Sequence, residues 1–430
     1  MITPRRPAKN VSAIPFNIDS DMIEAHRCRS CGSTHSLPVI DLGLQPLANN
    51  LLHPEDLGKP EPRFPVAVFV CGDCWLMQIT NTVPPIDLFG EYLYFSSFSD
   101  AMLRHARAAV EKHIAEKKLG KESFVVEIAS NDGYMLKNFV EAGVPCLGIE
   151  PAANIANVAR KIGVETHCAF FGKETARELR EQRGLADLIL GNNVFAHAPD
   201  TNDFVAGVAE LLKPDGWVVF EFPYGVEMIG KVEFDTIYHE HVYYFTLTPL
   251  IPLFARHGMD VFHVERVAIH GGSLRLYACR QGSETIRGTV RQTLDDEAQR
   301  GVSCAAYYQR FSDEAARVRA DLIAFFEEQK KAGKRIAAYG ASAKGSTLLN
   351  YVGDAAKTLD FIADRSTYKH GLLSPGLHVP IVTAEELAAR RPDYAVLLVW
   401  NFAEEVMAQQ HEFRAKGGQF VIPLPQLTVA

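Results

Sequence analysis

The chain has 430 residues, of which 47% are hydrophobic and 22% charged, and its 44 Lys and Arg against 52 Asp and Glu give a formal net charge of −8. This composition is typical of globular proteins, so disorder and fibrous structure are excluded, and the length corresponds to roughly two to four domains. A modestly acidic chain without a basic stripe is a poor match for nucleic acid. The apolar run at 394–400 is far shorter than the ~18–20 residues of a membrane span.

Residues 1–20 contain no continuous apolar segment of about 7–15 residues, because Pro4, Pro7 and Asn10 interrupt them. We therefore expect a flexible lead rather than an export signal, and a chain that stays in the cytoplasm. In that reducing compartment cysteines are thiols or metal ligands rather than disulfides.

Four of the eight cysteines form two C-x2-C pairs, which we place in a domain over residues 21–85. Four thiolates suit tetrahedral Zn²⁺ and leave no open position for a catalytic water, so we predict a structural zinc site. A redox pair or coincidence is the alternative. The 39 residues between the pairs exceed the usual roughly 15–20, which predicts an inserted hairpin. The predicted ligands are Cys28, Cys31, Cys71 and Cys74, whereas Cys146, Cys168, Cys279 and Cys304 are expected to be buried, inert thiols.

Residues 86–290 show alternating apolar runs and amphipathic segments, the pattern of an α/β domain with a parallel sheet. Charged helical sequence then predicts one connecting helix over 295–332, in a segment bounded at 291–332, and a second α/β domain follows over 333–430. The expected strands are 124–129, 145–149, 186–190, 216–222, 335–339, 358–363, 394–400 and 419–422. The expected helices are 134–142, 152–162, 203–212, 346–351 and 404–415.

The loop after the first strand of the central domain is a predicted cofactor site, since ligands of such sheets lie beyond the carboxyl ends of strands. Glu150 ends the next strand, where a carboxylate can accept ribose hydroxyls of NAD(P) or of S-adenosylmethionine (SAM). A single glycine flanked by Glu127 and Asp132 disfavours a diphosphate, whereas carboxylates attract the cationic groups of SAM. We therefore predict SAM, with a plain strand-to-helix turn as the alternative. The predicted cofactor residues are Glu127, Ser130, Asn131, Asp132, Gly133, Glu150, Asn192 and Asn193.

The segment Tyr238-His239-Glu240-His241 gathers two imidazoles, a carboxylate and a phenol, which suits acid/base chemistry. A neighbouring glutamate can also orient the tautomer of a histidine. A metal site and a polar loop at a domain boundary are the alternatives. His197, after the strand 186–190, is a further candidate, with a helix-capping or core histidine as its alternative.

Two glycine-bearing loops complete the candidate site. The first, His270-Gly-Gly-Ser273-Leu-Arg275, suits phosphate or sugar oxygens or else an ordinary hairpin turn. The second has the glycine spacing of a P-loop, but serine follows Gly345 where a P-loop has lysine, so an NTPase is excluded. Its Ser342 and Lys344, at the start of a helix, can hold the diphosphate of a nucleotide sugar, with a plain turn as the alternative.

The order of these motifs over residues 28–402, ending in Trp-Asn-Phe, resembles that of SAM-dependent C-methyltransferases that act on nucleotide-linked 4-keto deoxyhexoses, mostly at C-3. The resemblance implies an α/β fold. A central Rossmann-like class I methyltransferase sheet would lie between an N-terminal zinc-binding module and a C-terminal Rossmann-like domain that binds the sugar nucleotide. Ala129 departs from the usual motif, which has glycine there.

The resemblance also assigns the catalytic base to His241 and places Tyr238, Glu240 and His197 around the reacting sugar. It implies removal of a proton beside the ketone and attack of the enolate on the SAM methyl group. An O- or N-methyltransferase, a non-catalytic zinc and nucleotide module, and an oxidoreductase remain as alternatives. The residues expected to bind substrate are Tyr92, His239, His270, Ser273, Arg275, Ser342 and Lys344.

Overall fold

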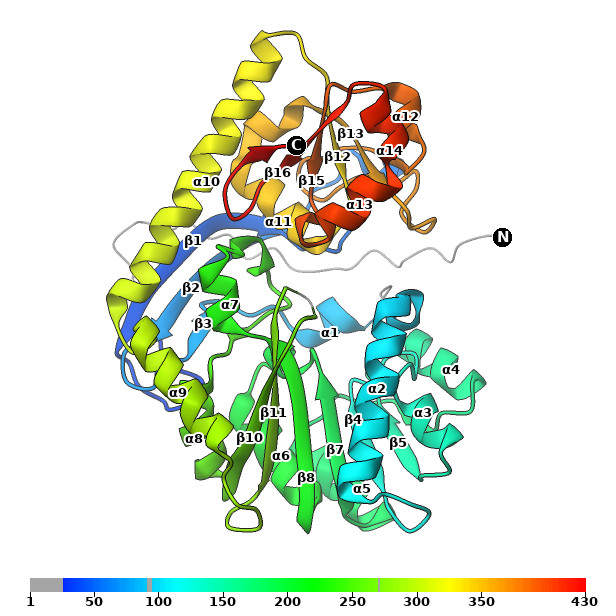
Figure 1. The fold of residues 1–430 in the computed structure, drawn as a ribbon, viewed down its shortest axis with the longest axis vertical. Coiled ribbons are helices and arrows are strands. Elements are labelled where there is room, and N and C mark those ends of the chain that lie inside the picture. Colours follow the sequence, from blue (N-terminus) through cyan, green and yellow to red (C-terminus); the bar gives the residue numbers. More distant parts are fainter. Residues whose placement is uncertain (1–25, 91–94, 270) are drawn as a thin grey trace.

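The computed structural model describes residues 26–90, 95–269 and 271–430, and these form three sheets that pack into one molecule (Figure 1). The C-terminal sheet lies at the top of the view and the central sheet at the bottom, with the N-terminal sheet beside the junction between them. Within the described residues, no helix has the length and apolar character needed to cross a membrane. The predicted lead at 1–20 lies outside the described residues.

The N-terminal sheet is antiparallel and contains the hairpin predicted between the two cysteine pairs, which is therefore confirmed. Its last strand comes from the segment directly after Tyr238–His241, so this sheet carries one end of the candidate catalytic motif. The strands, in sheet order, are β1 (Ser36–Pro46), β2 (Arg63–Cys71), β3 (Met77–Ile79) and β9 (Tyr243–Tyr244).

The central sheet has seven strands in the order β10-β11-β8-β7-β4-β5-β6, and only β11 runs antiparallel to its neighbours. This is the strand order of the class I methyltransferase sheet, so the predicted fold class is confirmed. The strands are β4 (Val125–Ile128), β5 (Cys146–Ile149), β6 (Thr166–His167), β7 (Ala186–Asn192), β8 (Leu212–Pro223), β10 (Met259–Val267) and β11 (Ser273–Arg280).

Helices cover both faces of the central sheet, which explains why β4 is apolar at successive positions. Val125 packs in the same cluster as Val110 and Phe139, whereas Val126 packs on the opposite face with Val205. These helices are α2 (Asp100–Lys117), α3 (Leu136–Glu141), α4 (Ala153–Lys161), α5 (Lys173–Arg183), α6 (Thr201–Leu211) and α8 (Leu247–Arg256). Helix α1 (Pro85–Phe89) precedes them, and α7 (Gly225–Gly230) lies above the sheet, beside the N-terminal strands (Figure 1).

One connecting helix was predicted over 295–332. A long helix is present over Ala305–Lys331, but the predicted start was wrong, because residues 295–300 belong to a separate helix. Helix α9 (Gly288–Arg300) ends because Gly301 has a φ of 85°, a left-handed conformation that favours glycine. Helix α10 (Ala305–Lys331) then spans about 40 Å along the N-terminal and C-terminal sheets (Figure 1). Its Tyr308 ring stacks on Trp75, beside the second cysteine pair, at 6.3 Å.

The C-terminal sheet has the order β14-β13-β12-β15-β16-β17 and is parallel except at β17. Its strands are β12 (Ile336–Tyr339), β13 (Leu359–Asp364), β14 (Ile381–Thr383), β15 (Tyr394–Leu397), β16 (Gln419–Ile422) and β17 (Thr428–Val429). Its helices are α11 (Ala343–Val352), α12 (Glu386–Arg390), α13 (Ala403–Gln409) and α14 (His411–Ala415), joined by the 3₁₀ turns η5 (Gly353–Thr358) and η6 (Trp400–Phe402).

Several details differ from the sequence predictions. The strand predicted at 394–400 ends at Leu397, because the chain turns at η6, and the helix predicted at 404–415 is interrupted at Gln410. Among the four single cysteines, Cys146 and Cys279 are buried, as expected. Cys168 and Cys304 are exposed, so the expectation of burial was wrong for these two, which lie in a loop and before α10.

Candidate active site and zinc centre

The four predicted zinc ligands come together at the end of the N-terminal sheet, with all four sulfur atoms within 4.8 Å of one another. The Sγ atoms of Cys28 and Cys74, and those of Cys31 and Cys71, are 3.6 Å apart. Tetrahedral Zn²⁺ with bonds of about 2.3 Å places neighbouring sulfurs about 3.8 Å apart, so this geometry fits the ion. Gln78 Nε2 donates to Cys28 Sγ at 3.2 Å and orients one ligand from outside.

The first cysteine pair also fastens the N-terminal unit to two helices of the central unit. Asn202, on α6, donates to the carbonyl oxygens of Arg29 and Ser30 at 2.8 and 3.0 Å. Arg256, on α8, donates to the carbonyl and hydroxyl oxygens of Ser30 at 3.0 and 2.6 Å. A bound zinc ion therefore stabilises the turn to which the central unit is attached.

The loop after β4 doubles back sharply at the carboxyl edge of the central sheet. Ala129, Asn131 and Gly133 have φ angles of 54°, 50° and 80°. The left-handed conformation costs a residue other than glycine about 1–2 kcal/mol, so Ala129 carries local strain. Gly133 has a second requirement, because a Cβ there would lie 3.0 Å from Val164 Cγ2.

Three carboxylates are buried around this loop: Glu127, Asp132 and Glu150 are 1%, 1% and 5% exposed. Burial raises the pKa of Glu127, and the charges of Asp132 and Glu150 raise it further; burial also raises the pKa of Glu150. Among the described residues, Glu127 Oε2 and Asp132 Oδ1 are buried without a hydrogen-bond partner. A cationic ligand would stabilise these carboxylates, and SAM, with its ammonium and sulfonium groups, fits that requirement.

Some of the predicted cofactor residues support the loop itself. Glu150 accepts from the backbone N–H groups of Asn131 and Ala152 at 3.0 and 2.9 Å. The Ser130 hydroxyl faces β5, since a Cβ built on Gly148 would lie 2.2 Å from Ser130 Oγ. After β7, Asn192 Nδ2 lies 3.7 Å from the sulfur of Met135.

A short turn that the sequence analysis did not identify rests on this loop. The 3₁₀ turn η2 (Ser96–Phe98) donates its backbone N–H groups to the loop: Ser96 to Asn131 Oδ1 at 2.9 Å and Ser97 to Asp132 Oδ2 at 3.1 Å. Tyr92 precedes it but lies outside the described residues. The side chains of Asn131 and Asp132 thus hold Ser96 and Ser97 against the cofactor loop.

His241 has a defined hydrogen-bonding arrangement. Its Nδ1–H donates to the backbone carbonyl of Thr236 at 2.7 Å, and its Nε2 lies 3.1 Å from the hydroxyl of Tyr238. Because Nδ1 carries the proton, Nε2 is the acceptor nitrogen of the ring and accepts from Tyr238. A backbone carbonyl, rather than the Glu240 considered from the sequence, therefore sets the tautomer.

His197 lies beside His241 at the carboxyl edge of the central sheet. It ends the turn η3 (Phe195–His197) after β7, and the two imidazole rings are 5.0 Å apart and nearly perpendicular. The backbone N–H of Val242 donates to Ala196 O at 2.7 Å and holds the motif against this turn. Burial, and then the proximity of His241, lowers the pKa of His197 well below its usual value, which keeps it neutral.

The other two residues of the motif face the N-terminal unit. His239 Nε2–H donates to Phe64 O at 3.3 Å, and burial lowers the pKa of His239 to about 4. Glu240 Oε1 accepts from Asn49 Nδ2 at 2.7 Å. The alternative of a metal at this motif gains no support, because the four cysteines are the one group with metal-ligand geometry in the described part of the chain.

The first glycine-bearing loop connects the antiparallel strands β10 and β11, which is the hairpin considered as its alternative. A Cβ on Gly271 would lie 2.7 Å from Glu233 Oε1, and one on Gly272 would lie 2.9 Å from Glu227 Cγ, so the glycines permit close approach to these side chains. Ser273 Oγ donates to Ile269 O at 3.1 Å. His270 lies outside the described residues.

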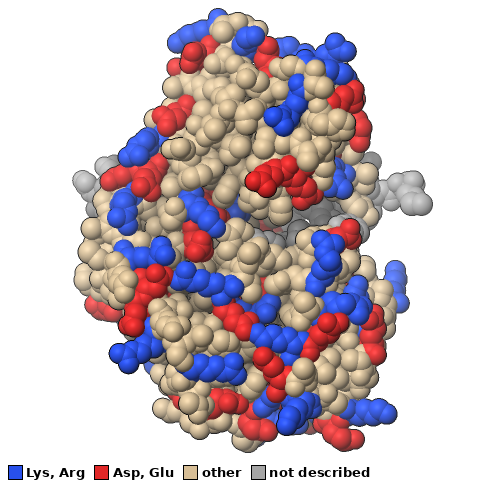
Figure 2. Space-filling model, in the orientation of Figure 1, with Lys and Arg blue, Asp and Glu red and all other residues tan. Residues whose placement is uncertain are grey.

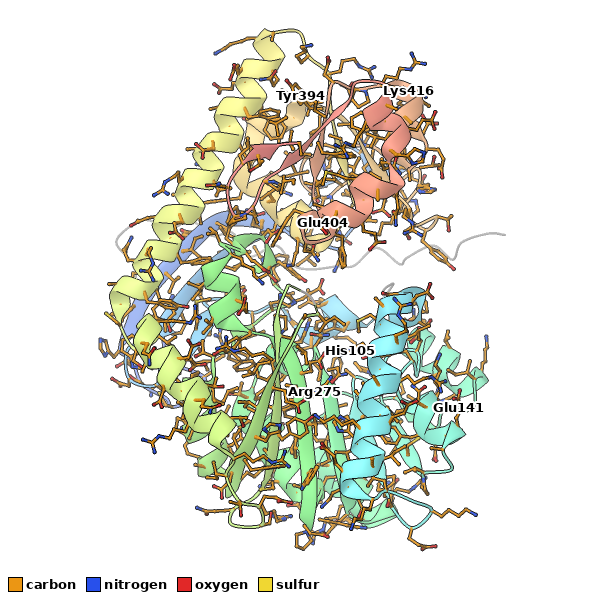
Figure 3. The ribbon with its side chains drawn as sticks, in the orientation of Figure 1. His105, Glu141, Arg275, Tyr394, Glu404 and Lys416 are labelled. Carbon is orange, nitrogen blue, oxygen red and sulfur yellow. The ribbon has the colours of Figure 1, made fainter. Side chains whose placement is uncertain are left out.

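Arg275 lies inside the central unit, in an ion pair with Glu221 on β8. Its Nε and one terminal nitrogen donate to Glu221 Oε2 at 3.0 and 2.7 Å. His105 Nε2, on α2, lies 2.8 Å from Glu221 Oε1 and 3.2 Å from a terminal nitrogen of Arg275, and Figure 3 labels His105 and Arg275 close together in the central unit. Arg275 thus makes a buried contact with a carboxylate, and its predicted contact with substrate stays a prediction.

The predicted residues of the C-terminal unit lie at the start of α11. Ser342 Oγ accepts from the backbone N–H of Gly345 at 3.0 Å and caps the helix. Lys344 Nζ donates to Glu233 Oε2 of the central unit at 3.1 Å and lies 5.4 Å from the centre of the Trp400 ring. The face drawn in Figure 2 is hollowed between these two units, with acidic and basic side chains interspersed around it.

Comparison with known families finds matches along most of the chain. Residues 28–89 match a family described as "Putative zinc binding domain", residues 101–264 a "Methyltransferase domain", and residues 268–425 a "C-methyltransferase C-terminal domain".

The chain is also similar to individual proteins. C-methyltransferase NovU of Streptomyces niveus is 39% identical over 400 residues, which cover 93% of this chain and 95% of NovU. A ubiquinone biosynthesis O-methyltransferase of Bordetella avium (strain 197N) is 31% identical over 98 residues, covering 22% of this chain and 41% of that protein. A solved SAM-dependent methyltransferase from Clostridium acetobutylicum ATCC 824 has a TM-score of 0.34 and 11% identity, covering 42% of this chain and 92% of that one. Because its similarity to NovU extends over nearly its whole length, this chain belongs to the family of SAM-dependent C-methyltransferases.

Proposed function

We propose that this C-methyltransferase methylates the carbon beside the ketone, at C-3, of a nucleotide-linked 4-keto-deoxy sugar, with His241 as the base. A carbon atom becomes nucleophilic when a neighbouring carbonyl stabilises its deprotonated form, so a C-methyltransferase of this kind needs a base and a ketone. The sequence resemblance supplies the sugar class, and the arrangement around His241 supplies the base.

The observation that carries the proposal is the fixed tautomer of His241. With Nδ1–H held by Thr236 O at 2.7 Å, Nε2 is the atom that accepts the proton of C-3. The electron pair of the broken C–H bond passes into the enolate, whose carbon then bonds to the methyl group. SAM, when bound, would supply that methyl group as an electrophile, with the electron pair of the broken S–CH₃ bond left on the sulfur of S-adenosylhomocysteine. The Thr236 carbonyl stabilises the imidazolium that His241 becomes.

The neighbouring groups favour this role. His197 stays neutral because its pKa is lowered, so it adds no positive charge 5.0 Å from the ring that must accept a proton. The Tyr238 hydroxyl, 3.1 Å from Nε2, is in position to donate to the enolate oxygen once the substrate displaces it from His241.

The nucleotide part of the substrate is proposed to bind at the start of α11. Backbone N–H groups at a helix N-terminus favour phosphate oxygens, and Ser342 and Lys344 lie there. An O- or N-methyltransferase would use the same cofactor loop but would need no ketone. The similarity to NovU, a C-methyltransferase, favours carbon as the acceptor.

The proposal is tested by mass-detected methylation of a panel of TDP-, GDP- and CDP-linked 4-keto-deoxy sugars. We expect one or more members to gain a methyl group on carbon. His241→Asn should lower kcat by roughly 10²–10⁴ while SAM still binds in calorimetry, and the exposed His411→Asn should behave as wild type. Unchanged kcat in His241→Asn would remove this residue from the role of base, and methylation on oxygen or nitrogen would refute the reaction.

A further inference from the structure

A short turn connects the C-terminal unit to His241. The 3₁₀ turn η4 (Phe234–Thr236) ends with Thr236, whose carbonyl accepts from His241 Nδ1 at 2.7 Å. The preceding residue, Asp235, contacts the C-terminal unit: its Oδ2 accepts from the indole Nε1–H of Trp400 at 2.7 Å. The acceptor that fixes the imidazole is thus one residue from a contact between units.

The contact is buried and has three parts. Asp235 is 0% exposed, and its Oδ1 has no hydrogen-bond partner among the described residues. The hydrogen bond from the indole N–H therefore offsets part of the free-energy cost of burying this carboxylate. The Phe234 ring packs edge-on against Tyr351 of α11 at 5.4 Å. Glu233 accepts from Lys344, which in turn lies over the ring of Trp400.

These contacts restrict η4 from the side of the C-terminal unit. Val232, two residues before the turn, has a φ of 57°, and the motif that contains His241 begins two residues after the turn. A turn of three residues has few internal hydrogen bonds to fix its carbonyl groups. Two backbone hydrogen bonds hold it, from Thr236 N–H to Glu233 O at 3.1 Å and from Ile237 N–H to Phe234 O at 3.0 Å, and the side-chain contacts with α11 and η6 restrict it further.

We propose that Asp235, through its hydrogen bond with Trp400, is a positioning residue that holds His241 in the tautomer with Nδ1 protonated. The proposal rests on the proposed role of His241 as base. It gives the C-terminal unit a part in proton transfer in addition to the proposed substrate binding. Trp400, on this unit, would fix the Thr236 carbonyl, and this carbonyl leaves Nε2 of His241 as the nitrogen that accepts a proton.

The test uses the full-length protein with ¹⁵N-labelled histidine, since the ¹⁵N resonances of an imidazole report which nitrogen carries the proton. His241→Asn assigns the signal of His241. In wild type we expect a single tautomer at His241, and in Trp400→Phe, which removes the indole N–H and keeps an aromatic ring, a second tautomer. Asp235→Ala should have the same effect, and Asp235→Asn, which retains an acceptor oxygen, should restore the wild-type signal.

Trp217→Phe is the matched control. It removes another indole-to-carboxylate hydrogen bond, from Trp217 Nε1 to Glu284 Oε1 at 2.8 Å, and should leave the His241 signal unchanged. With an accepted sugar nucleotide, Trp400→Phe should lower kcat about tenfold, the loss of roughly one hydrogen bond, with the KM for SAM unchanged.

A single, unchanged tautomer of His241 in Trp400→Phe would overturn the proposal. If the proposed function fails, the result appears in the activity assay instead: His241→Asn would keep the wild-type turnover, while Trp400→Phe still changed the tautomer of His241. The NMR measurement needs no turnover, so the two outcomes are distinguishable.

Discussion

The ion pair between Arg275 and Glu221 gives a prediction with a defined magnitude. The two side chains are 8% and 1% exposed, and the closest nitrogen-to-oxygen distance is 2.7 Å. Glu221→Gln keeps the shape of the side chain and removes its charge. The guanidinium of Arg275 is then left buried with the more distant Glu265, at 3.6 Å, as its remaining carboxylate.

Breaking a buried ion pair costs about 3–5 kcal/mol, because one desolvated charge stays uncompensated. At about 3 kcal/mol, the midpoint of thermal unfolding of the central unit should fall by about 6–12 °C. Replacing both partners, as in Glu221→Gln with Arg275→Met, removes the charges together and should restore part of that loss.

The pH dependence follows from the pKa of Glu221. Burial raises this pKa, but hydrogen bonds and charges from His105 and Arg275 outweigh burial, and the net result is a lowered pKa. A carboxyl group with a lowered pKa in the folded state contributes stability above its unfolded pKa of about 4.3, and that stability is lost as the pH falls toward the folded pKa. Glu221→Gln should therefore lose less stability than wild type on going from pH 6 to pH 3.

Calorimetry on the two variants and wild type measures both effects. Glu174→Gln, which removes an exposed ion pair with Arg177, is the control and should leave the midpoint unchanged. A midpoint for Glu221→Gln that equals that of the control would refute the assignment of Arg275 to a structural pair. If Arg275→Met raised the KM for the sugar nucleotide without changing the midpoint, the original expectation of a substrate contact would be right.

Two further predictions concern stability. A thiol reagent should release one zinc ion per chain from the wild-type protein, and less than one would contradict the assignment. Cys71→Ala should lose the zinc ion and have a lower midpoint of thermal unfolding. Cys304→Ala, at an exposed cysteine outside the cluster, is the control and should retain the ion. Glu297, fully buried, accepts from Tyr224 OH and from the backbone N–H groups of Leu247 and Thr248 at the start of α8, so Glu297→Gln should destabilise the chain by about 1–3 kcal/mol in chemical unfolding. Equal stability of Glu297→Gln and wild type would show that these bonds contribute nothing.

Local sequence predicts most of the central sheet because parallel strands buried on both faces are continuous apolar runs. The segment at 124–129 is such a run, and β4 forms there. The cysteine pairs are equally informative, since spacing alone indicates the ligand set. The break between α9 and α10 was missed because Gly301 follows a helical pattern and lies in an otherwise charged segment.

The candidate site shows where local sequence stops being informative. The motif Tyr238–His241 was identified, but its side chains divide between two units, with His239 at Phe64 and His241 at Thr236. Neither partner can be identified from spacing, because Phe64 is more than 170 residues away and the other partner is a backbone carbonyl. The burial of Arg275 beside Glu221 likewise depends on the register of β11 against β8, in which these two residues are paired.

The most direct test of the central claim is hydrogen exchange at carbon in the absence of turnover. An accepted 4-keto sugar nucleotide, incubated in D₂O with the enzyme and S-adenosylhomocysteine, should exchange its C-3 proton for deuterium, as followed by NMR, and His241→Asn should lose this exchange. Methylation of C-3 with exchange that is as fast in His241→Asn as in wild type would contradict the account.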